Sequence, residues 1–249
     1  IGIVCLLIFV PIVIYLVALF AILGLVMGSA LNCLALRIAK GEKWSGNSRS
    51  ACPKCGHTLS ALELIPLVSW LIQGGKCRHC KAPISIRYPL TEAILAAVFV
   101  AMLLKFGLTA ELFSALVFAG CLLCLSLVDL DTQIIPDRFI LIPIAVRAAQ
   151  LLFTGGFSAL LGASVPGFII AGAVLLLSLI MDKVLKKDTM GGGDIKLLFV
   201  IGLYLTLPEC LLMVMLSCVI GIVMAGQAEG STRSSRFDND GLSLGSVRI

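Results

Sequence analysis

Charged residues are scarce in this sequence. Only 13% of its 249 residues are Asp, Glu, Lys or Arg, whereas 59% are hydrophobic and the mean hydropathy is +1.10. Because soluble domains carry about one quarter charged residues, this scarcity excludes an ordinary soluble domain. Apolar runs long enough to cross a bilayer recur along the chain, which favours membrane-spanning helices over a β-barrel. The composition therefore predicts an integral protein of the lipid bilayer.

Other features are also absent. The sequence has no internal repeat and no heptad pattern. The first apolar run lacks a small-residue cleavage site and is too long for the core of a signal peptide, so we interpret it as a membrane span. The chain begins at Ile1 rather than Met, and we expect a few preceding residues to be missing. The net charge of +5 comes from loops beside the spans, a distribution that predicts no nucleic-acid partner.

The pattern of apolar runs predicts an all-α polytopic membrane protein with about seven transmembrane helices. We divide the chain into a first membrane span (1–36), a polar loop (37–88), a membrane domain (89–225) and a polar tail (226–249). The tail is predicted to be disordered or foreign to the rest of the chain. The predicted spans are 3–27 (its helix continuing to about Ile38), 89–106, 111–128, 138–154, 159–181, 195–207 (the shortest) and 209–225.

The distribution of charge predicts the orientation. Loop 37–88 carries nine basic residues and two acidic ones, which places it in the cytoplasm by the positive-inside rule. Counting spans onward places loops 129–138 and 182–196 on the same side. The second of these loops contains four lysines, whereas the opposite loops near 105–111 and 154–158 are almost uncharged. All candidate functional residues are therefore predicted on one face.

Four of the ten cysteines form two Cys-x-x-Cys pairs in the polar loop, separated by 21 residues. This spacing is typical of a closed, tetrahedral structural zinc site. A disulfide pair is the alternative, which a reducing cytosol disfavours. Cys121-x-x-Cys124 lies inside an apolar run with no partner pair, so we assign it to the core. The predicted zinc ligands are Cys52, Cys55, Cys77 and Cys80.

Two carboxylates occur where apolar runs meet polar loops. Asp129 follows the run ending at Val128, and Asp194 follows three glycines, Gly191 to Gly193. An acid at such a boundary is energetically costly and usually functional. Two neighbouring carboxyls that share a proton can act as base on a water molecule and acid on a carbonyl, as in aspartic proteases. The alternative is that each Asp caps a helix, with Lys196 as a counter-charge.

The combined motifs resemble a known family. Gly191, Gly193 and Asp194 fit the Gly-x-Gly-Asp signature of membrane aspartic proteases. The segment from Asp129 to Ile135-Pro136-Asp137 looks like that of bacterial type IV prepilin peptidases, and the resemblance covers about residues 24–205. It is also carried by Gly28-Ser29-Ala30-Leu31-Asn32 with Arg37, by Ser69-Trp70, and by Arg87-Tyr88-Pro89 with Glu92.

The resemblance implies cleavage of a short basic leader from type IV prepilins or pseudopilins, followed by N-methylation of the new terminus with S-adenosylmethionine. It assigns catalysis to Asp129 and Asp194 at the cytoplasmic face of the bacterial inner membrane. We expect Asp131 and Asp137 to attract the basic leader, and Gly191 and Gly193 to let its backbone approach. The family's Pro-Phe-Gly-Pro-like segment and final span are not found in the tail.

Two other functions are considered. An ion- or proton-coupled transporter could use Asp129 and Asp194 as carriers, but transporters place such acids at mid-span, whereas both lie at span ends. A non-catalytic assembly protein built around the zinc loop is the third hypothesis. No Gly-rich turn between a strand and a helix marks a site for S-adenosylmethionine, so methyl transfer rests on the resemblance alone.

Overall fold

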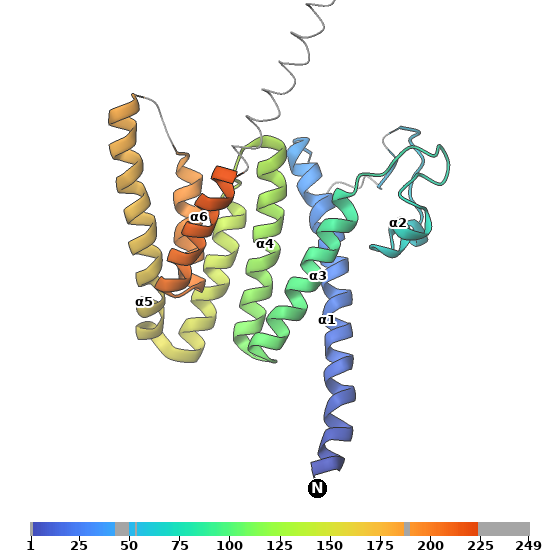
Figure 1. Cartoon of the computed structure of the whole chain (residues 1–249), viewed down its shortest axis with the longest axis horizontal. Coiled ribbons are helices and arrows are strands. Elements are labelled where there is room, and N and C mark those ends of the chain that lie inside the picture. Colours follow the sequence, from blue (N-terminus) through green and yellow to red (C-terminus); the bar gives the residue numbers. More distant parts are fainter. Residues whose placement is uncertain (1, 43–49, 53, 187–189, 224–249) are drawn as a thin grey trace, which may run out of the picture.

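The computed structural model describes residues 2–42, 50–52, 54–186 and 190–223, and the predicted disordered tail lies outside them. Within this part of the chain the fold is a bundle of helices, accompanied by one small polar loop that contains two isolated β-bridges (Figure 1). The all-helical prediction is confirmed. The helices are α1 (Gly2–Ala39), η1 (Ala61–Leu64), α2 (Val68–Ile72), α3 (Arg87–Phe106), α4 (Ala110–Thr132), α5 (Arg138–Leu185), α6 (Gly192–Tyr204) and an unlabelled helix, Leu207–Val223.

Four helices are long and apolar enough to cross a membrane: α1 from Val10 onward, α3, α4 and α5. Helix α5 contains 48 residues, roughly 72 Å at 1.5 Å per residue if it were straight, which is more than twice the ~30 Å hydrocarbon core. It reverses at Gly156, whose φ of 69° and ψ of −166° are not helical. Figure 1 shows its two arms running antiparallel. The turn predicted near 154–158 is therefore present, while the total of seven spans stays a prediction.

Helix α1 packs closely along α3 and also contacts α4. Gly24 and Gly28 lie one turn apart on α1 and make this approach possible. A methyl group added at Gly24 would lie 2.5 Å from the Cα of Ala96, and one added at Gly28 would lie 2.9 Å from the Cα of Glu92. Any larger residue at these positions would therefore push α1 and α3 apart.

Helix α6 packs along α5 and also reaches the core beside α4. Gly202 of α6 crosses Gly167 of α5 so closely that an added methyl group would overlap the Gly167 backbone. The rings of Phe118 in α4 and Tyr204 in α6 stack with centroids 4.1 Å apart. One apolar core, which includes Ala35, Val128, Phe139 and Val200, thus joins α1, α4, α5 and α6.

The polar segments gather at one end of the bundle. The C-terminal ends of α1 and α4 lie at the same end as the N-terminal ends of α3, α5 and α6 (Figure 1). The polar loop between α1 and α3 also projects from this end. The chain order and the antiparallel packing therefore bring the predicted cysteine site and both aspartate motifs to one face, as expected from the count of spans.

Candidate active site and cysteine cluster

Asp129 lies in the last turn of α4 and is exposed. The helix ends at Gln133, which adopts a left-handed conformation with φ 54° and whose amide donates to the Asp129 carbonyl. An acid near the C-terminus of a helix faces the negative end of the helix dipole, which is unfavourable for a carboxylate. Asp129 therefore does not stabilise α4 as a cap, contrary to the capping alternative.

Asp194 lies in the first turn of α6, behind the three glycines. The N-cap residue is Gly191, whose carbonyl accepts from the Asp194 amide at 3.1 Å. Gly193 lies against Ile135 of the loop that follows α4, where an added methyl group would come within 3.1 Å of the Ile135 Cβ. The glycine segment therefore contacts the segment that begins with Asp129.

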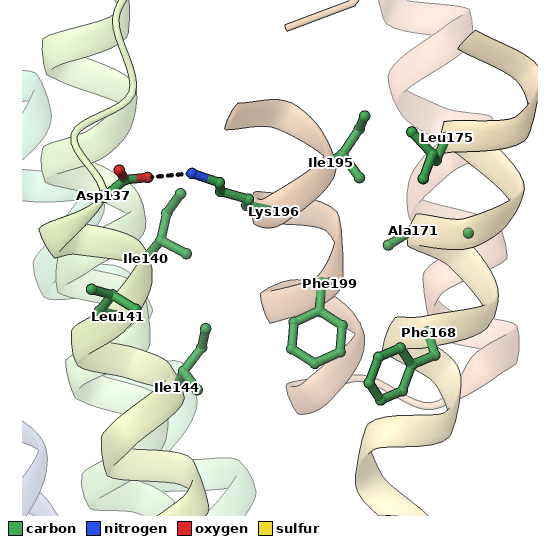
Figure 2. A pocket seen from close by; sticks show the side chains of 11 residues that line it. Asp137, Ile140, Leu141, Ile144, Phe168, Ala171, Leu175, Ile195, Lys196 and Phe199 are labelled. Carbon is green, nitrogen blue, oxygen red and sulfur yellow. Dashed lines mark hydrogen bonds and ion pairs between the residues drawn. The ribbon is translucent and has the colours of Figure 1, made fainter. Parts of the chain in front are cut away.

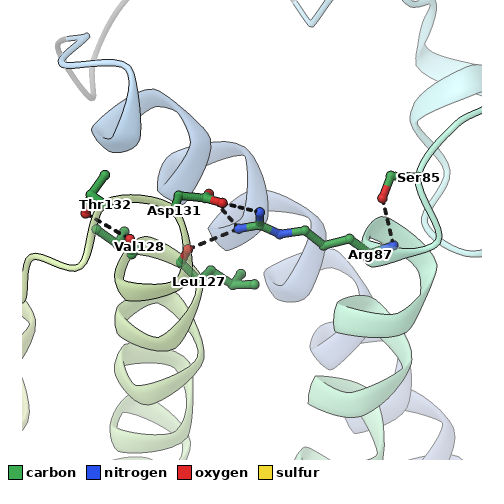
Figure 3. A network of polar contacts seen from close by, with 6 residues as sticks. All are labelled: Ser85, Arg87, Leu127, Val128, Asp131 and Thr132. Carbon is green, nitrogen blue, oxygen red and sulfur yellow. Dashed lines mark hydrogen bonds and ion pairs between the residues drawn. The ribbon is translucent and has the colours of Figure 1, made fainter. Parts of the chain in front are cut away.

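Asp131 is held by a cation from another helix. The Arg87 guanidinium reaches from the first turn of α3 and donates to both Asp131 carboxylate oxygens, at 2.7 and 2.8 Å (Figure 3). The same guanidinium donates to the Leu127 carbonyl at 3.1 Å. Planar two-point pairing of this kind is among the strongest side-chain interactions. It ties the start of α3 to the last turn of α4.

Asp137 precedes α5 and is also paired. Its Oδ1 atom accepts from the Nζ of Lys196 in α6 at 2.8 Å (Figure 2). Lys196 is thus the counter-charge of Asp137, and no ion pair joins it to Asp194. The pair borders an apolar cavity of about 590 Å³ between the two arms of α5 and α6. Its apolar lining includes Ile140, Leu141, Ile144, Phe168, Leu175, Ile195 and Phe199.

The remaining two acids have no such partner. Among the residues that the structure describes, neither the Asp129 nor the Asp194 carboxylate forms an ion pair or a side-chain hydrogen bond. Both lie at the same end of the bundle, and Val128 and Leu197, close to them in sequence, share one apolar core. The structure thus presents two unpaired carboxyls at the same end of the bundle, one in the last turn of α4 and one in the first turn of α6, where Gly193 contacts Ile135 of the loop that follows α4.

The four predicted cysteine ligands come together in the polar loop. Their sulfur atoms all lie within 4.8 Å of one another, and the Sγ atoms of Cys52 and Cys80 are 3.8 Å apart. Four sulfurs bound tetrahedrally at about 2.3 Å from a zinc ion would be separated by about 3.8 Å. All four are free thiols, so the disulfide alternative is not supported, and the cluster could hold a metal ion.

The two Cys-x-x-Cys pairs have the same backbone form. The amide of Cys52 donates to the His57 carbonyl, and the amide of Cys77 donates to that of Ala82. Gly56 and Lys81, each directly after the second cysteine of its pair, have φ values of 70° and 59°. These paired turns aim the sulfurs at a common centre. Amides of Cys55 and Lys54 donate to the Cys52 sulfur and lower its pKa to about 6, whereas burial and the neighbouring thiols raise the pKa of Cys55 to about 11. Cys52 is therefore the sulfur of this pair that most readily forms the thiolate that a metal requires.

A polar contact attaches the loop to α3. Glu92 of α3 is 5% exposed and accepts from the Leu67 amide at 2.7 Å, where Leu67 has a positive φ of 60°. Within the loop, the Trp70 indole donates to the Ile84 carbonyl at 3.3 Å. Both Glu92 and Trp70 belong to the motifs that carry the family resemblance: Glu92 places the loop on α3, and Trp70 joins two segments of the loop.

Two further observations concern residues away from these clusters. Cys121 and Cys124 are buried in the apolar core, which confirms their assignment as core residues. In the polar loop, Glu63 accepts from the amide and hydroxyl of Ser60. These hydrogen bonds lower the pKa of Glu63 and give it a local structural role.

Comparison with known proteins gives consistent matches. Residues 22–106 match the Bacterial Peptidase A24 N-terminal domain, and residues 116–226 match the Type IV leader peptidase family. No solved structure matches the chain significantly.

Similar curated proteins carry the name prepilin leader peptidase/N-methyltransferase. The protein from Myxococcus xanthus is 36% identical over 88% of this chain and 67% of its own length. The protein from Aeromonas hydrophila is 39% identical over 71% of this chain and 60% of its own length. The protein from Bacillus subtilis is 33% identical over 83% of this chain and 81% of its own length. With both domain matches in chain order and these identities, the chain belongs to the type IV leader peptidase family.

Proposed function

We propose that this protein cleaves the leader peptide from prepilins or pseudopilins at the cytoplasmic face of the bacterial inner membrane and N-methylates the new terminus. The observation that carries the cleavage proposal is the pair of unpaired carboxyls, Asp129 and Asp194, on helix ends at the same end of the bundle. The relatives' names supply the substrate class and the second activity. The proposal covers the whole protein, of which this chain matches 60–81% in the three relatives described above.

In the proposed mechanism Asp129 and Asp194 share one proton. The ionised carboxyl takes a proton from a water molecule that attacks the scissile carbonyl, and the protonated one donates to the carbonyl oxygen. The tetrahedral intermediate then collapses as the leaving amine is protonated. The acids Asp131 and Asp137 are already paired with Arg87 and Lys196, so they take no part in this exchange.

The surroundings suit an extended, partly apolar substrate. Gly191 carries no side chain, so the substrate backbone can approach Asp194 closely there, whereas the space beside Gly193 is already filled by Ile135. We propose that Asp131 and Asp137 contribute acidic character that attracts the basic leader, even though each already has a cation at its side. The apolar cavity next to Ile195 and Lys196 lies on the membrane side of this region.

Zinc is the metal that we propose for the cysteine cluster, because four thiolates at this separation are its preferred structural ligands. With all four positions filled by protein, the ion has no open site for water, so its role is to hold the loop. S-adenosylmethionine is proposed as the methyl donor on the relatives' names alone. Among the described residues no Gly-rich strand-to-helix turn forms a pocket for it, and no catalytic step is assigned to it.

The single test of the cleavage proposal uses the two acids. Asp129→Asn and Asp194→Asn should each abolish leader cleavage, because an amide can neither take up nor share the proton. Both variants should still insert in the membrane, since neither carboxyl has a structural partner. The measurement is co-expression with a prepilin, followed by mass spectrometry of its N-terminus, which reports cleavage and methylation together. Full cleavage by either variant would exclude the two-aspartate mechanism.

A further inference from the structure

Arg147 is an unexpected cation inside the apolar bundle. It lies in the first arm of α5, nine residues after Arg138 and nine before the reversal at Gly156. At 1.5 Å per residue this is roughly 14 Å from the start of the arm, close to the middle of a ~30 Å hydrocarbon layer. A charge at this depth is costly and usually has a defined task. The proposed cleavage mechanism does not use it.

The Arg147 guanidinium is satisfied by α6 and by its own helix. Its Nε atom donates to the Leu203 carbonyl at 3.3 Å, and its Nη1 atom donates to the Gln150 amide oxygen at 2.6 Å. Its Cζ atom lies 5.2 Å from the centroid of the Tyr204 ring, in cation–π range. No acidic residue in the described part of the chain forms an ion pair with it. Two of its three contacts are therefore with the last turn of α6.

The length of α6 explains why such a contact is needed. Its 13 residues extend roughly 20 Å, which is too short to cross the hydrocarbon core. In Figure 1 the turn between α6 and helix Leu207–Val223 stops short of the end of the bundle where α5 reverses. The last carbonyls of α6 thus lie within the apolar layer, where unpaired carbonyls cost several kcal/mol. Helix α6 has no basic residue of its own in its last turn.

Arg147 supplies both things that this helix end lacks. Its N–H groups satisfy a terminal carbonyl, and its positive charge faces the negative end of the α6 dipole. The other end of α6 is tied to the same arm of α5 by the pair between Lys196 and Asp137. The Tyr204 hydroxyl of α6 also donates to the Pro143 carbonyl of this arm, at 2.8 Å. Three polar ties to one helix thus fix the position of α6 along its axis, and Arg147 is the only one of the three that contributes a positive charge at the C-terminal end of α6. Asp194, two residues before Lys196, is carried by this helix.

We propose that Arg147 is a positioning residue. It holds α6 and helix Leu207–Val223 as a re-entrant hairpin at fixed depth, and thereby sets the height of Asp194 at the membrane surface. The activity measurement below rests on the proposed cleavage function, whereas the labelling measurement does not. If the unmodified protein cleaves no prepilin, the proposed function fails and the labelling result still decides the role of Arg147.

The activity measurement compares Arg147→Met with Ser114→Ala. Ser114 is buried in the same network and donates to Gln150 at 3.2 Å, but it does not contact α6. We expect Arg147→Met to lower kcat on the order of 100-fold with little change in KM, because a small displacement of a catalytic group has that effect. Arg147→Lys should recover part of the loss, and Ser114→Ala should stay near the unmodified rate. An unchanged kcat in Arg147→Met would overturn the proposal.

The labelling measurement tests depth without activity. Pro208→Cys lies at the hairpin turn and Ser158→Cys lies at the α5 reversal, and each is treated with a membrane-impermeant thiol reagent on either side. Labelling is located at the introduced cysteine by peptide mass spectrometry, because the chain also contains native free thiols. With Arg147 in place, Pro208→Cys should stay unlabelled from both sides, whereas Ser158→Cys should react on the side opposite the cysteine cluster. Combining Pro208→Cys with Arg147→Met should expose the thiol. Labelling of Pro208→Cys alone at the rate of Ser158→Cys would overturn the proposal, even if Arg147→Met does not accumulate in the membrane.

Discussion

At the scale of single residues, the four acids near the candidate site differ in their partners. Asp131 is paired with Arg87 and Asp137 with Lys196, while Asp129 and Asp194 form no ion pair within the described part of the chain. The sequence suggested that Asp129 and Asp194 differ from the others through their positions at the ends of apolar runs. It could not indicate the pairing, because Arg87 and Asp131 are 44 residues apart and meet only through the packing of α3 and α4.

This pairing gives a prediction for Asp131. Asp131→Asn should destabilise the protein by about 1–2 kcal/mol, since it removes one charge from a two-point hydrogen-bonded pair that is only about one quarter exposed on each side. It should leave most leader cleavage intact, unlike Asp129→Asn. Thermal unfolding in detergent measures the first effect, and the prepilin assay measures the second.

A double-mutant cycle separates the pair from other contacts. Arg87→Met, Asp131→Asn and the double variant should show a coupling of about 1 kcal/mol or more, with Arg87→Met the more harmful because it also leaves the Leu127 carbonyl without its donor. Loss of cleavage in Asp131→Asn as complete as in Asp129→Asn would make Asp131 a catalytic residue instead.

At the scale of elements, the polar loop is the part whose structure depends most on a ligand. Its described residues contain only two short helices, η1 and α2, and two isolated β-bridges. The four sulfurs converge from both ends of the loop, so a bound ion would close it. The loop is joined to α3 through Glu92, and α3 is joined to the last turn of α4 through Arg87.

We predict about one zinc ion per chain in protein purified under reducing conditions without chelator. Replacing both Cys52 and Cys77 by Ser should abolish metal binding, because one ligand is lost from each pair. The zinc content is measured by inductively coupled plasma mass spectrometry and divided by the protein concentration. The matched control replaces Cys121 and Cys124, which lie in the apolar core, by Ala. This double variant should have an unchanged zinc content. Metal-free protein would remove the zinc assignment.

The elements were predictable to different degrees. The long apolar runs that form α3, α4 and both arms of α5 were predicted close to their observed positions, because length and hydropathy determine such helices. The cysteine spacing predicted the cluster, because four sulfurs around one centre leave few alternatives. The shortness of α6 was visible in the sequence, but its buried end was not. Arg147 could have been found as a lone arginine within an apolar run, which is the signal that buried functional charges leave.

At the scale of the whole molecule, the arrangement depends on the reversal at Gly156. If α5 did not fold back there, α6 and Asp194 would begin at the opposite end of the bundle from Asp129. The sequence predicted this turn from Gly155-Gly156 and from the length of the run, whereas the close crossing of Gly167 and Gly202 could not be inferred from local pattern. Contacts between helices distant in sequence depend on side-chain packing that periodicity does not encode.

The shared face gives a prediction about topology. A cysteine introduced at Ser158 should react with an impermeant reagent from outside the cell, because it lies at the α5 reversal, opposite the polar end of the bundle. A cysteine introduced at Thr132 should react only after the membrane is opened, because it lies in the last turn of α4 beside Asp131. The rate at which each introduced cysteine reacts with the reagent is compared between intact and permeabilised cells. External labelling at Thr132 would contradict a cytoplasmic active site.

The exposure of Asp129 at the end of α4 has a consequence for the supply of water. Hydrolysis consumes one water molecule per peptide bond, and a protease whose acids lie deep in lipid must conduct that water through a hydrated passage. Under the proposed two-aspartate mechanism, the exposed Asp129 at the end of α4 would receive its water directly from bulk solvent. The substrate must then diffuse laterally in the bilayer until its scissile bond reaches the end of the helix bundle where Asp129 lies. Turnover should therefore respond to the fluidity and thickness of the surrounding bilayer more than to changes in solvent access.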